Sequence, residues 1–188
     1  AACRAGGLVA VHSPRPAVAA IQVLLPAVRP TGRRLGIVAD GGGHGVLAAD
    51  LAVAAGLSVP RLSAATAEAL ADGLPATAST ANPVDLAGGG EQDLASYARV
   101  VDGLLAAGEV DAVLLTGFFG GYSIRSEELG RRESAAAAGM AAARDGHGRA
   151  LLVQSMHAGS APCDELRRRG IPVFAAIEDA IGALAAAV

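Results

Sequence analysis

The stretch Leu35-Gly36-Ile37-Val38-Ala39-Asp40-Gly41-Gly42-Gly43-His44-Gly45-Val46-Leu47-Ala48-Ala49-Asp50 decides the fold, because it joins a short apolar run to an Ala-rich run through a glycine-rich turn. The first run is typical of a buried strand and the second of a helix. In a parallel sheet such a turn lies at the carboxyl edge, where glycines let an anion approach the backbone and the helix N terminus supplies unpaired N–H groups. The turn lacks the Gly-Lys-Ser/Thr of a Walker A loop and the spacing of the dinucleotide fingerprint. It therefore predicts either a phosphate site made of backbone amides or a tight turn that only brings the helix close to the strand.

Apolar runs alternate with Ala-rich helical runs along the rest of the chain, which is the pattern of an α/β domain with a parallel sheet covered by helices on both faces. Strands are predicted at residues 8–11, 35–39, 58–62, 112–116, 150–154 and 172–175. Helices are predicted at residues 17–25, 44–55, 64–70, 92–107, 126–144, 162–169 and 178–187. Gly56, Gly108, Gly146 and Gly170 each follow a helical run, where a left-handed residue commonly ends a helix.

Composition excludes several classes of function. The 188 residues carry a formal net charge of -3, and all 15 basic residues are arginines without a long basic cluster, so we expect no nucleic-acid partner. Without lysine there is no Schiff-base chemistry. Cys3 and Cys163 lie far apart and outside any CxxC motif, so no metal site is predicted. No apolar run has the roughly 18–20 residues of a membrane span, and we expect no membrane partner and a cytoplasmic location.

The segment 26–34, with two prolines, a glycine and three arginines, is the best candidate for a linker. We therefore expect residues 1–30 to be the tail of a preceding domain plus this linker, and residues 31–188 to form the main domain. The chain opens in Ala1-Ala2-Cys3-Arg4 without an initiator Met, and we expect it to be a fragment.

Two further glycine-rich turns accompany the first. One is Thr80-Ala81-Asn82-Pro83-Val84-Asp85-Leu86-Ala87-Gly88-Gly89-Gly90 and the other is Leu115-Thr116-Gly117-Phe118-Phe119-Gly120-Gly121-Tyr122. Three such turns in one small domain predict a shared rim where backbone amides converge on an anion. The alternative is three independent loops, in which Asn82 caps a turn and Asp85 caps a helix or pairs with an arginine.

These motifs together resemble a known domain. The series Gly42-Gly43-His44-Gly45-Val46-Leu47-Ala48-Ala49-Asp50, Ala81-Asn82-Pro83-Val84-Asp85-Leu86 and Val110-Asp111-Ala112-Val113-Leu114-Leu115, leading to Phe119-Gly120-Gly121, is similar to the ligase domain of succinyl-CoA synthetases and ADP-forming acetate-CoA ligases. The ending Gly170-Ile171-Pro172-Val173-Phe174 with Glu178-Asp179-Ala180 fits the same domain. The resemblance runs from about residue 32 to the C terminus, with the motifs in the family's order and spacing.

The resemblance implies a flavodoxin-like, three-layer fold and a role in the reaction that interconverts acid, CoA and NTP with acyl-CoA, NDP and phosphate. In that family the N terminus of a so-called power helix, here residues 44–55, faces the phosphate carried by a phosphohistidine. A dianionic phosphoryl group needs preorganised N–H donors more than it needs acid or base groups. The implied phosphate-binding residues are Gly42, Gly43, His44, Gly45, Asn82, Asp85, Gly88, Gly120 and Gly121.

The resemblance also implies what lies outside this chain. The Ser-His-Thr-Gly type loop that carries the family's phosphohistidine is not in the sequence, so we predict no catalytic residue here and no activity for the fragment alone. CoA, NTP or NDP and Mg²⁺ would bind the parent enzyme, whose CoA-binding, phosphohistidine ligase and ATP-grasp domains are the expected partners. The alternative function is a noncatalytic regulatory or anion-binding module that keeps the fold.

Three side chains near the turns have two interpretations each. A helix N terminus lowers the proton affinity of imidazole, so His44 is interpreted as a loop or capping residue rather than as a nucleophile. His157 either contacts a ligand at the same edge or is a solvated loop residue. Asp85 either orients a histidine, or holds its own turn by accepting backbone N–H bonds.

Overall fold

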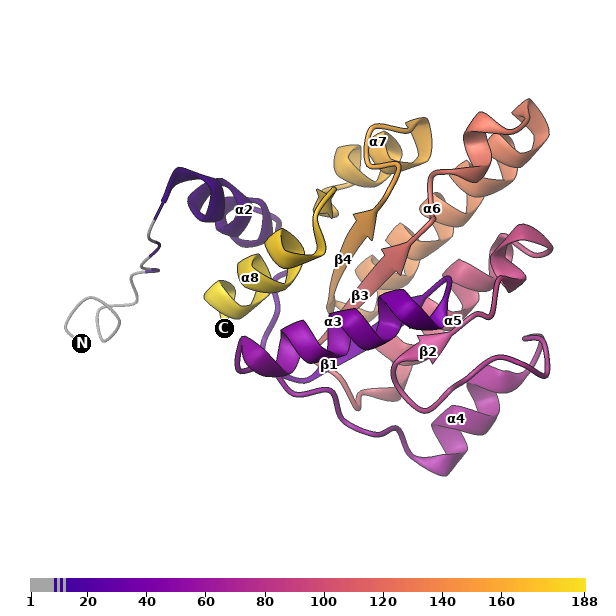
Figure 1. Ribbon diagram of the computed structural model, residues 1–188, viewed down its shortest axis with the longest axis horizontal. Coiled ribbons are helices and arrows are strands. Elements are labelled where there is room, and N and C mark those ends of the chain that lie inside the picture. The colour runs from indigo at the N-terminus through magenta and orange to yellow at the C-terminus, as the bar shows by residue number, and fades with distance from the viewer. Residues whose placement is uncertain (1–8, 10, 12) are drawn as a thin grey trace.

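The computed structural model describes residues 9, 11 and 13–188, and in this part of the chain a five-stranded sheet lies between two layers of helices (Figure 1). The strands are β1 (Leu35–Ala39), β2 (Val84–Asp85), β3 (Ala112–Gly117), β4 (Ala150–Ser155) and β5 (Val173–Phe174). The helices are α2 (Pro14–Leu24), α3 (Gly42–Ala54), α4 (Ala64–Ala71), α5 (Ala95–Ala107), α6 (Glu127–His147), α7 (Ala161–Arg168) and α8 (Ile177–Ala187). Two short 3-10 turns are η1 (Gly89–Glu91) and η2 (Tyr122–Ile124).

The sheet has the order β2-β1-β3-β4-β5, and every neighbouring pair is parallel. This is the strand order of a flavodoxin-like doubly wound sheet, so the predicted fold class is confirmed. Because all strands run in one direction, the turns that follow them lie at one edge of the sheet. We call it the carboxyl edge.

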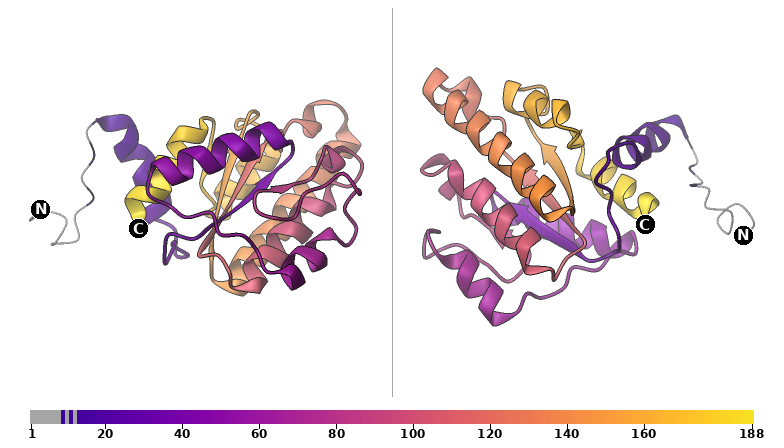
Figure 2. Two further views of the ribbon diagram at one scale, coloured as in Figure 1. Left: turned by 60° about the horizontal axis from the view of Figure 1, so that its bottom comes forward. Right: turned by 180° about the vertical axis from the view of Figure 1, so that it is seen from behind.

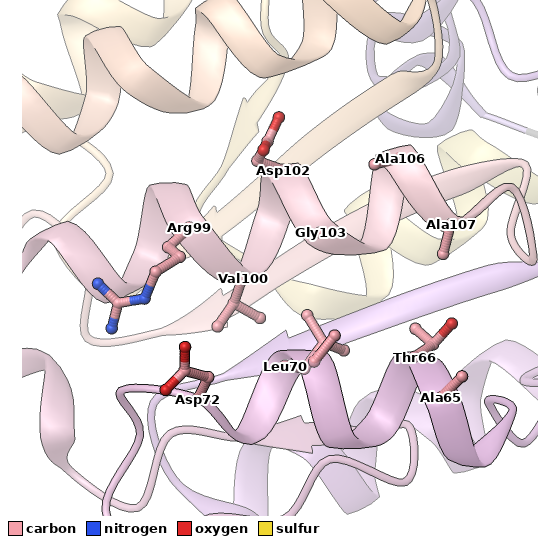
Figure 3. Close-up of a pocket in the computed structure, with 11 residues that line it drawn as sticks. Ala65, Thr66, Leu70, Asp72, Arg99, Val100, Asp102, Gly103, Ala106 and Ala107 are labelled. Atoms are coloured by element: carbon pink, nitrogen blue, oxygen red, sulfur yellow. The ribbon is translucent and has the colours of Figure 1, made fainter.

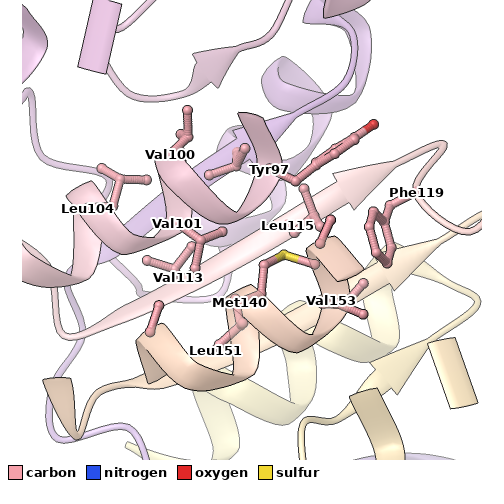
Figure 4. Close-up of a cluster of buried hydrophobic side chains, with 14 of the residues drawn as sticks. Tyr97, Val100, Val101, Leu104, Val113, Leu115, Phe119, Met140, Leu151 and Val153 are labelled. Atoms are coloured by element: carbon pink, nitrogen blue, oxygen red, sulfur yellow. The ribbon is translucent and has the colours of Figure 1, made fainter. Parts of the chain in front are cut away.

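Helices cover both faces of the sheet (Figure 2), and alternate residues of the central strands face the two helical layers, as a pleated strand requires. Leu114 and Leu152 point to the layer of α2, α3 and α8. Val113 and Val153 point to the opposite layer, where Tyr97 of α5 and Met140 of α6 also lie in the core (Figure 4). The central strands are buried on both faces, which is why they read in the sequence as continuous apolar runs.

The outer edge of β1 differs from the prediction. The strand expected at residues 58–62 is wrong, because only Ser58 makes an isolated bridge, with Arg34. Pro60 has no N–H to donate to a ladder. The edge strand is instead β2, which pairs Val84 with Val38 and was not predicted because it is so short.

Several helices begin or end at other residues than predicted. Ser126 caps α6 with its hydroxyl, which accepts from Leu129 N at 3.1 Å. This helix continues past Gly146 and ends at Gly148, whose φ is 61°, so Gly146 does not terminate it. Gly56, Gly108 and Gly170 have the expected positive φ. Helix α5 begins at Ala95 rather than at residue 92, because η1 precedes it.

Helix α2 packs on α8, so the two helices lie side by side (Figures 1 and 2). Its residues Ala19 and Val23 are buried in the same apolar cluster as α8, and Arg15 pairs with Asp179 at 2.7 Å. The strand predicted at residues 8–11 falls largely outside the described residues. The assignment of residues 1–30 to a preceding domain stays a prediction.

Candidate functional site

The carboxyl edge gathers the three glycine-rich turns. Residues 40–45 follow β1, residues 86–90 follow β2 and residues 118–122 follow β3, and these strands are neighbours in the sheet. The turns also meet through side chains. Tyr122 Oη donates to Asp40 Oδ2 at 2.8 Å, and Asp85 lies against Gly42. The shared edge is the arrangement that the sequence predicts.

The first turn presents unpaired backbone donors. The N–H groups of His44 and Gly45 both point to Gly41 O, at N···O distances of 3.1 and 3.4 Å. Within residues 13–188, the N–H groups of Gly42 and Gly43 have no hydrogen-bond acceptor, and both residues are exposed. They are the first two residues of the 13-residue helix α3, whose N terminus carries the positive end of its dipole. The turn therefore offers two free donors where an anion is favoured.

The other glycines of this turn have different surroundings. A Cβ at Gly43 would meet nothing within 4 Å. Gly45 is buried, and a Cβ there would lie 3.1 Å from Cβ of Pro83 and 3.3 Å from Cβ of Ala39. Gly45 thus serves the close approach of α3 to β1, which is the packing role that the sequence left open for this turn.

The second turn is held by Asp85. Its Oδ1 accepts from Ala87 N at 2.9 Å, which is the backbone-supporting role weighed for this residue. Its Oδ2 lies 3.1 Å from the position that a Cβ on Gly42 would take, so a carboxylate oxygen stands beside the N terminus of α3. Gly88, with φ 71°, is exposed on the same turn.

Asn82 supports β1 instead of facing the edge. Its Oδ1 accepts from Ile37 N at 2.9 Å, while its Nδ2 donates to Leu35 O at 3.0 Å and to Pro60 O at 2.8 Å. Along the outer edge of β1, the Asn82 side chain thus takes the backbone hydrogen bonds that lie between the bridge at Ser58 and the pairing with β2. Both amide hydrogens are used, so we leave Asn82 out of the donors available to an anion.

The third turn has no free glycine amide at its tip. Gly120 N donates to Glu133 Oε1 at 2.5 Å, and Gly121 N donates to Phe118 O at 2.8 Å. Glu133 Oε2 also accepts from Ser123 N at 2.8 Å. Gly120 and Gly121 are buried, so these two predicted binding residues shape the turn and present no donor to solvent.

Glu133 was missed by sequence reasoning. It is fully buried in α6, and burial raises the pKa of its carboxyl, against the effect of the backbone N–H groups that it accepts. In the sequence Glu133 stands between Arg132 and Ser134, just before an Ala-rich run, and nothing there distinguishes it from an exposed helical Glu. Its function in the fold is to fix the third turn.

A buried polar cluster lies beneath the turns. Tyr122 Oη donates to Asp40 Oδ2, while Asp40 Oδ1 and the Tyr97 hydroxyl are buried without a partner among the described residues. Burial raises the pKa of the Asp40 carboxyl, and the hydrogen bond from Tyr122 opposes that rise. Burial and the nearby Asp40 charge raise the pKa of Tyr97. Neither Asp40 nor the two tyrosines were among the predicted binding residues.

The histidines of this edge occupy its flanks. The ring of His44 packs near Gly117, since a Cβ on that glycine would lie 3.8 Å from His44 Cγ. The ring of His157 meets that of Phe118 edge to face, with centroids 4.8 Å apart. Arg125 lies over the rings of Phe118 and Tyr122 and pairs with Glu91, so it joins the second turn to the third.

A separate groove of about 530 Å³ runs between α4 and α5 (Figure 3). It is lined mostly by small side chains, with Asp72 and Arg99 at one end, and no residue of the three glycine turns lines it. We therefore do not include it in the candidate site.

Residues 9, 11 and 13–188 have neither a cluster of metal-ligating side chains nor a helix that could span a membrane. This part of the chain contains no group of three or more His, Cys, Asp or Glu side chains placed to hold a metal ion. None of its helices combines the length and apolarity that crossing a membrane requires.

No family model matches the sequence, and no curated protein sequence matches it significantly. Solved structures do match its fold. PH0766 from Pyrococcus horikoshii OT3 superposes with a TM-score of 0.80 and 23% identity, over 100% of this chain and 42% of that one. The dinucleotide-forming acetyl-coenzyme A synthetase 1 of Ca. Korarchaeum cryptofilum superposes with a TM-score of 0.78 and 21% identity, over 98% of this chain and 39% of that one. Its complex with phosphate and ADP gives the same values.

The chain spans about 40% of the length of these structures, which are larger proteins. At identities of 23% and 21%, the likeness establishes the fold. This chain thus has the fold of part of an archaeal acetyl-coenzyme A synthetase.

Proposed function

We propose that this chain is the phosphate- and phosphohistidine-handling domain of an NDP-forming acyl-CoA synthetase. The observation that carries the proposal is the pair of exposed, unpaired N–H groups of Gly42 and Gly43 at the N terminus of α3. The order of the motifs supports it, and so does the fold shared with part of an acetyl-coenzyme A synthetase.

In the proposed mechanism a phosphohistidine from another domain of the enzyme approaches the carboxyl edge. The N–H groups of Gly42 and Gly43 donate to the phosphoryl oxygens, and the dipole of α3 favours their negative charge. Such preorganised donors stabilise charge on a transferring phosphoryl group without taking or giving a proton. Gly88, exposed on the second turn, lines the approach.

Asp85 adds a hydrogen-bond acceptor to a site that otherwise offers donors. Its free Oδ2 beside Gly42 is an acceptor for an N–H group, whereas the amides of α3 are donors for an anion. A phosphorylated imidazole carries both an anionic group and a ring N–H donor, so it matches the pair better than a free anion does. The proposed role of Asp85 is therefore to orient the histidine, in addition to its observed role in the turn.

The rest of the reaction is assigned to other parts of the enzyme. CoA, the nucleotide and Mg²⁺ would bind the CoA-binding and ATP-grasp domains of the parent, and this domain holds none of them in the proposal. By itself it supplies no nucleophile and no turnover. Its partners are those domains and the ligase domain that carries the phosphohistidine.

The first test is an NMR titration with inorganic phosphate at low ionic strength. We expect saturable shifts centred on the amides of residues 41–46, lost in Gly43→Val, where a side chain fits without a clash but covers the free donors. Gly146→Val is the matched control, because Gly146 is an exposed helical glycine with open space, on α6. Shifts that spare residues 41–46 would remove the basis of the proposal.

The second test separates the synthetase domain from the noncatalytic anion-binding module. Adding the CoA-binding, phosphohistidine and ATP-grasp domains in trans should give NTP turnover that depends on acid and CoA, and Gly43→Val should abolish it. Phosphate binding without turnover, in the presence of folded partner domains, would favour the noncatalytic module.

A further inference from the structure

The carboxyl group of Asp40 lies directly before the glycine turn and has no cationic partner among residues 9, 11 and 13–188. The groups that face it are Tyr122 of η2, Tyr97 of α5, Asp85 of β2 and His44 of α3. Two of these are phenols and one is a second carboxylate. His44 is therefore the one neighbour in this set that can become a cation.

Arginine does not compensate the charge of Asp40. Arg125 is the arginine that lies over the Tyr122 ring, with its guanidinium carbon 5.6 Å from the ring centroid. Its charge is paired with Glu91 on the rim. Within the described part of the chain, Tyr122 donates the one hydrogen bond that the Asp40 carboxyl accepts, at Oδ2, while Oδ1 is shielded from solvent and has no partner.

An ionised Asp40 would thus place an uncompensated negative charge two residues before Gly42, whose N–H group is proposed to receive a phosphoryl group. Asp85 already stands beside the same helix N terminus. Two carboxylates near one site repel each other and disfavour double ionisation, and burial disfavours the charged form further. The direction of the pKa shift of Asp40, upward through burial, agrees with this geometry.

We propose that Asp40 makes anion binding at the glycine turn depend on pH. With a neutral carboxyl, the positive end of α3 is left to the ligand. When the carboxyl is ionised, its negative charge offsets the positive end of the α3 dipole, and the affinity of the turn for an anion falls. This inference rests on the proposed function, whose site it would regulate, and the acidic residue acts through the electrostatic field and not by touching the ligand.

The experiment uses sulfate as the probe, because sulfate stays dianionic over the whole titration and inorganic phosphate does not. Sulfate affinity is measured from the amide shifts of residues 41–46 between about pH 4.5 and about pH 8. For the wild type we expect the affinity to fall on the order of tenfold across the range. Asp40→Asn, which keeps the size and an acceptor for Tyr122, should bind at high pH as tightly as the wild type binds at low pH.

His44, at the N terminus of α3, is the neighbour of Asp40 whose contribution must be separated from that of Asp40. The titration is therefore repeated in His44→Asn, where the part of the profile due to Asp40 should remain. Asp50→Asn is the matched control, since Asp50 is an exposed carboxylate further along the same helix. It should leave the profile unchanged.

The outcomes are distinguishable. Sulfate binding with an unchanged profile in Asp40→Asn, or a profile that vanishes in His44→Asn alone, would overturn the role of Asp40 while leaving the anion site intact. No shift at residues 41–46 at any pH, in the wild type and in Asp40→Asn, would overturn the proposed site and the inference with it.

Discussion

Asn82→Ala is expected to destabilise the domain strongly, because this one side chain replaces a stretch of strand at the edge of β1. Its amide satisfies Ile37 N–H, Leu35 C=O and Pro60 C=O. Ile37 and Leu35 are fully buried, so water cannot take over their bonds. Pro60 is half-buried, and its carbonyl can find water. The substitution thus leaves two buried backbone groups without partners.

The magnitude follows from those two groups. A buried, unsatisfied polar group costs about 1–3 kcal/mol, which gives about 2–6 kcal/mol for the pair. Asn82 also has a φ of 68°, a conformation that costs Ala about 1 kcal/mol more than it costs Asn. We expect a total loss of about 3–7 kcal/mol. That is a large part of the roughly 5–15 kcal/mol that stabilises a typical domain.

Urea unfolding followed by circular dichroism measures this loss. Asn82→Gly separates the two contributions, because Gly accepts the positive φ freely and should be about 1 kcal/mol more stable than Asn82→Ala. Gln92→Ala is the control, since Gln92 is exposed at the end of η1 and the loss of its side chain should change stability by less than about 0.5 kcal/mol. A loss within about 1 kcal/mol of that control would refute the idea that Asn82 completes the edge of β1.

Three further expectations concern the carboxyl edge. Gly45→Val should lower the free energy of unfolding by about 1–3 kcal/mol, because its side chain would press on Pro83 and Ala39. Gly43→Ala should be neutral or stabilise α3 by up to about 1 kcal/mol. Parallel urea titrations compare the two variants, and equal effects would contradict the packing at Gly45. Glu133→Ala should cost about 2–4 kcal/mol and speed hydrogen exchange at the amides of the third turn that it now binds, with unchanged exchange as the contrary result. The pKa of Asp40 is raised on folding, so the stability that its neutral form contributes is fully present below the unfolded pKa and is lost as pH rises through the folded pKa. The free energy of unfolding of Asp40→Asn should therefore increase relative to that of the wild type as pH rises. A difference between the two proteins that stays constant with pH would contradict the burial of that carboxyl.

The amino-acid sequence by itself determined the class of the fold. The runs that became β1, β3 and β4 are mostly apolar, because both faces of those strands are buried. Burial on both faces thus leaves a mark on the local composition, which the sequence shows directly. The strand-turn-helix unit at residues 35–50 likewise predicted that the turn would sit at the carboxyl edge of a parallel sheet. The sequence also predicted the ends of three helices correctly, at Gly56, Gly108 and Gly170, and each of these glycines has a positive φ in the structure.

Tertiary structure decided which of the predicted groups are available. Three glycine turns look alike in sequence, yet the amides of Gly120 and Gly121 are consumed by Glu133 and Phe118, while those of Gly42 and Gly43 stay unpaired. Asn82 was predicted as a phosphate-binding residue, whereas in the structure its side chain bonds the backbone of Ile37 and Pro60, which lie far away in the chain. Hydrogen-bond partners of this kind depend on which segments meet in space, and no local pattern of residues records that.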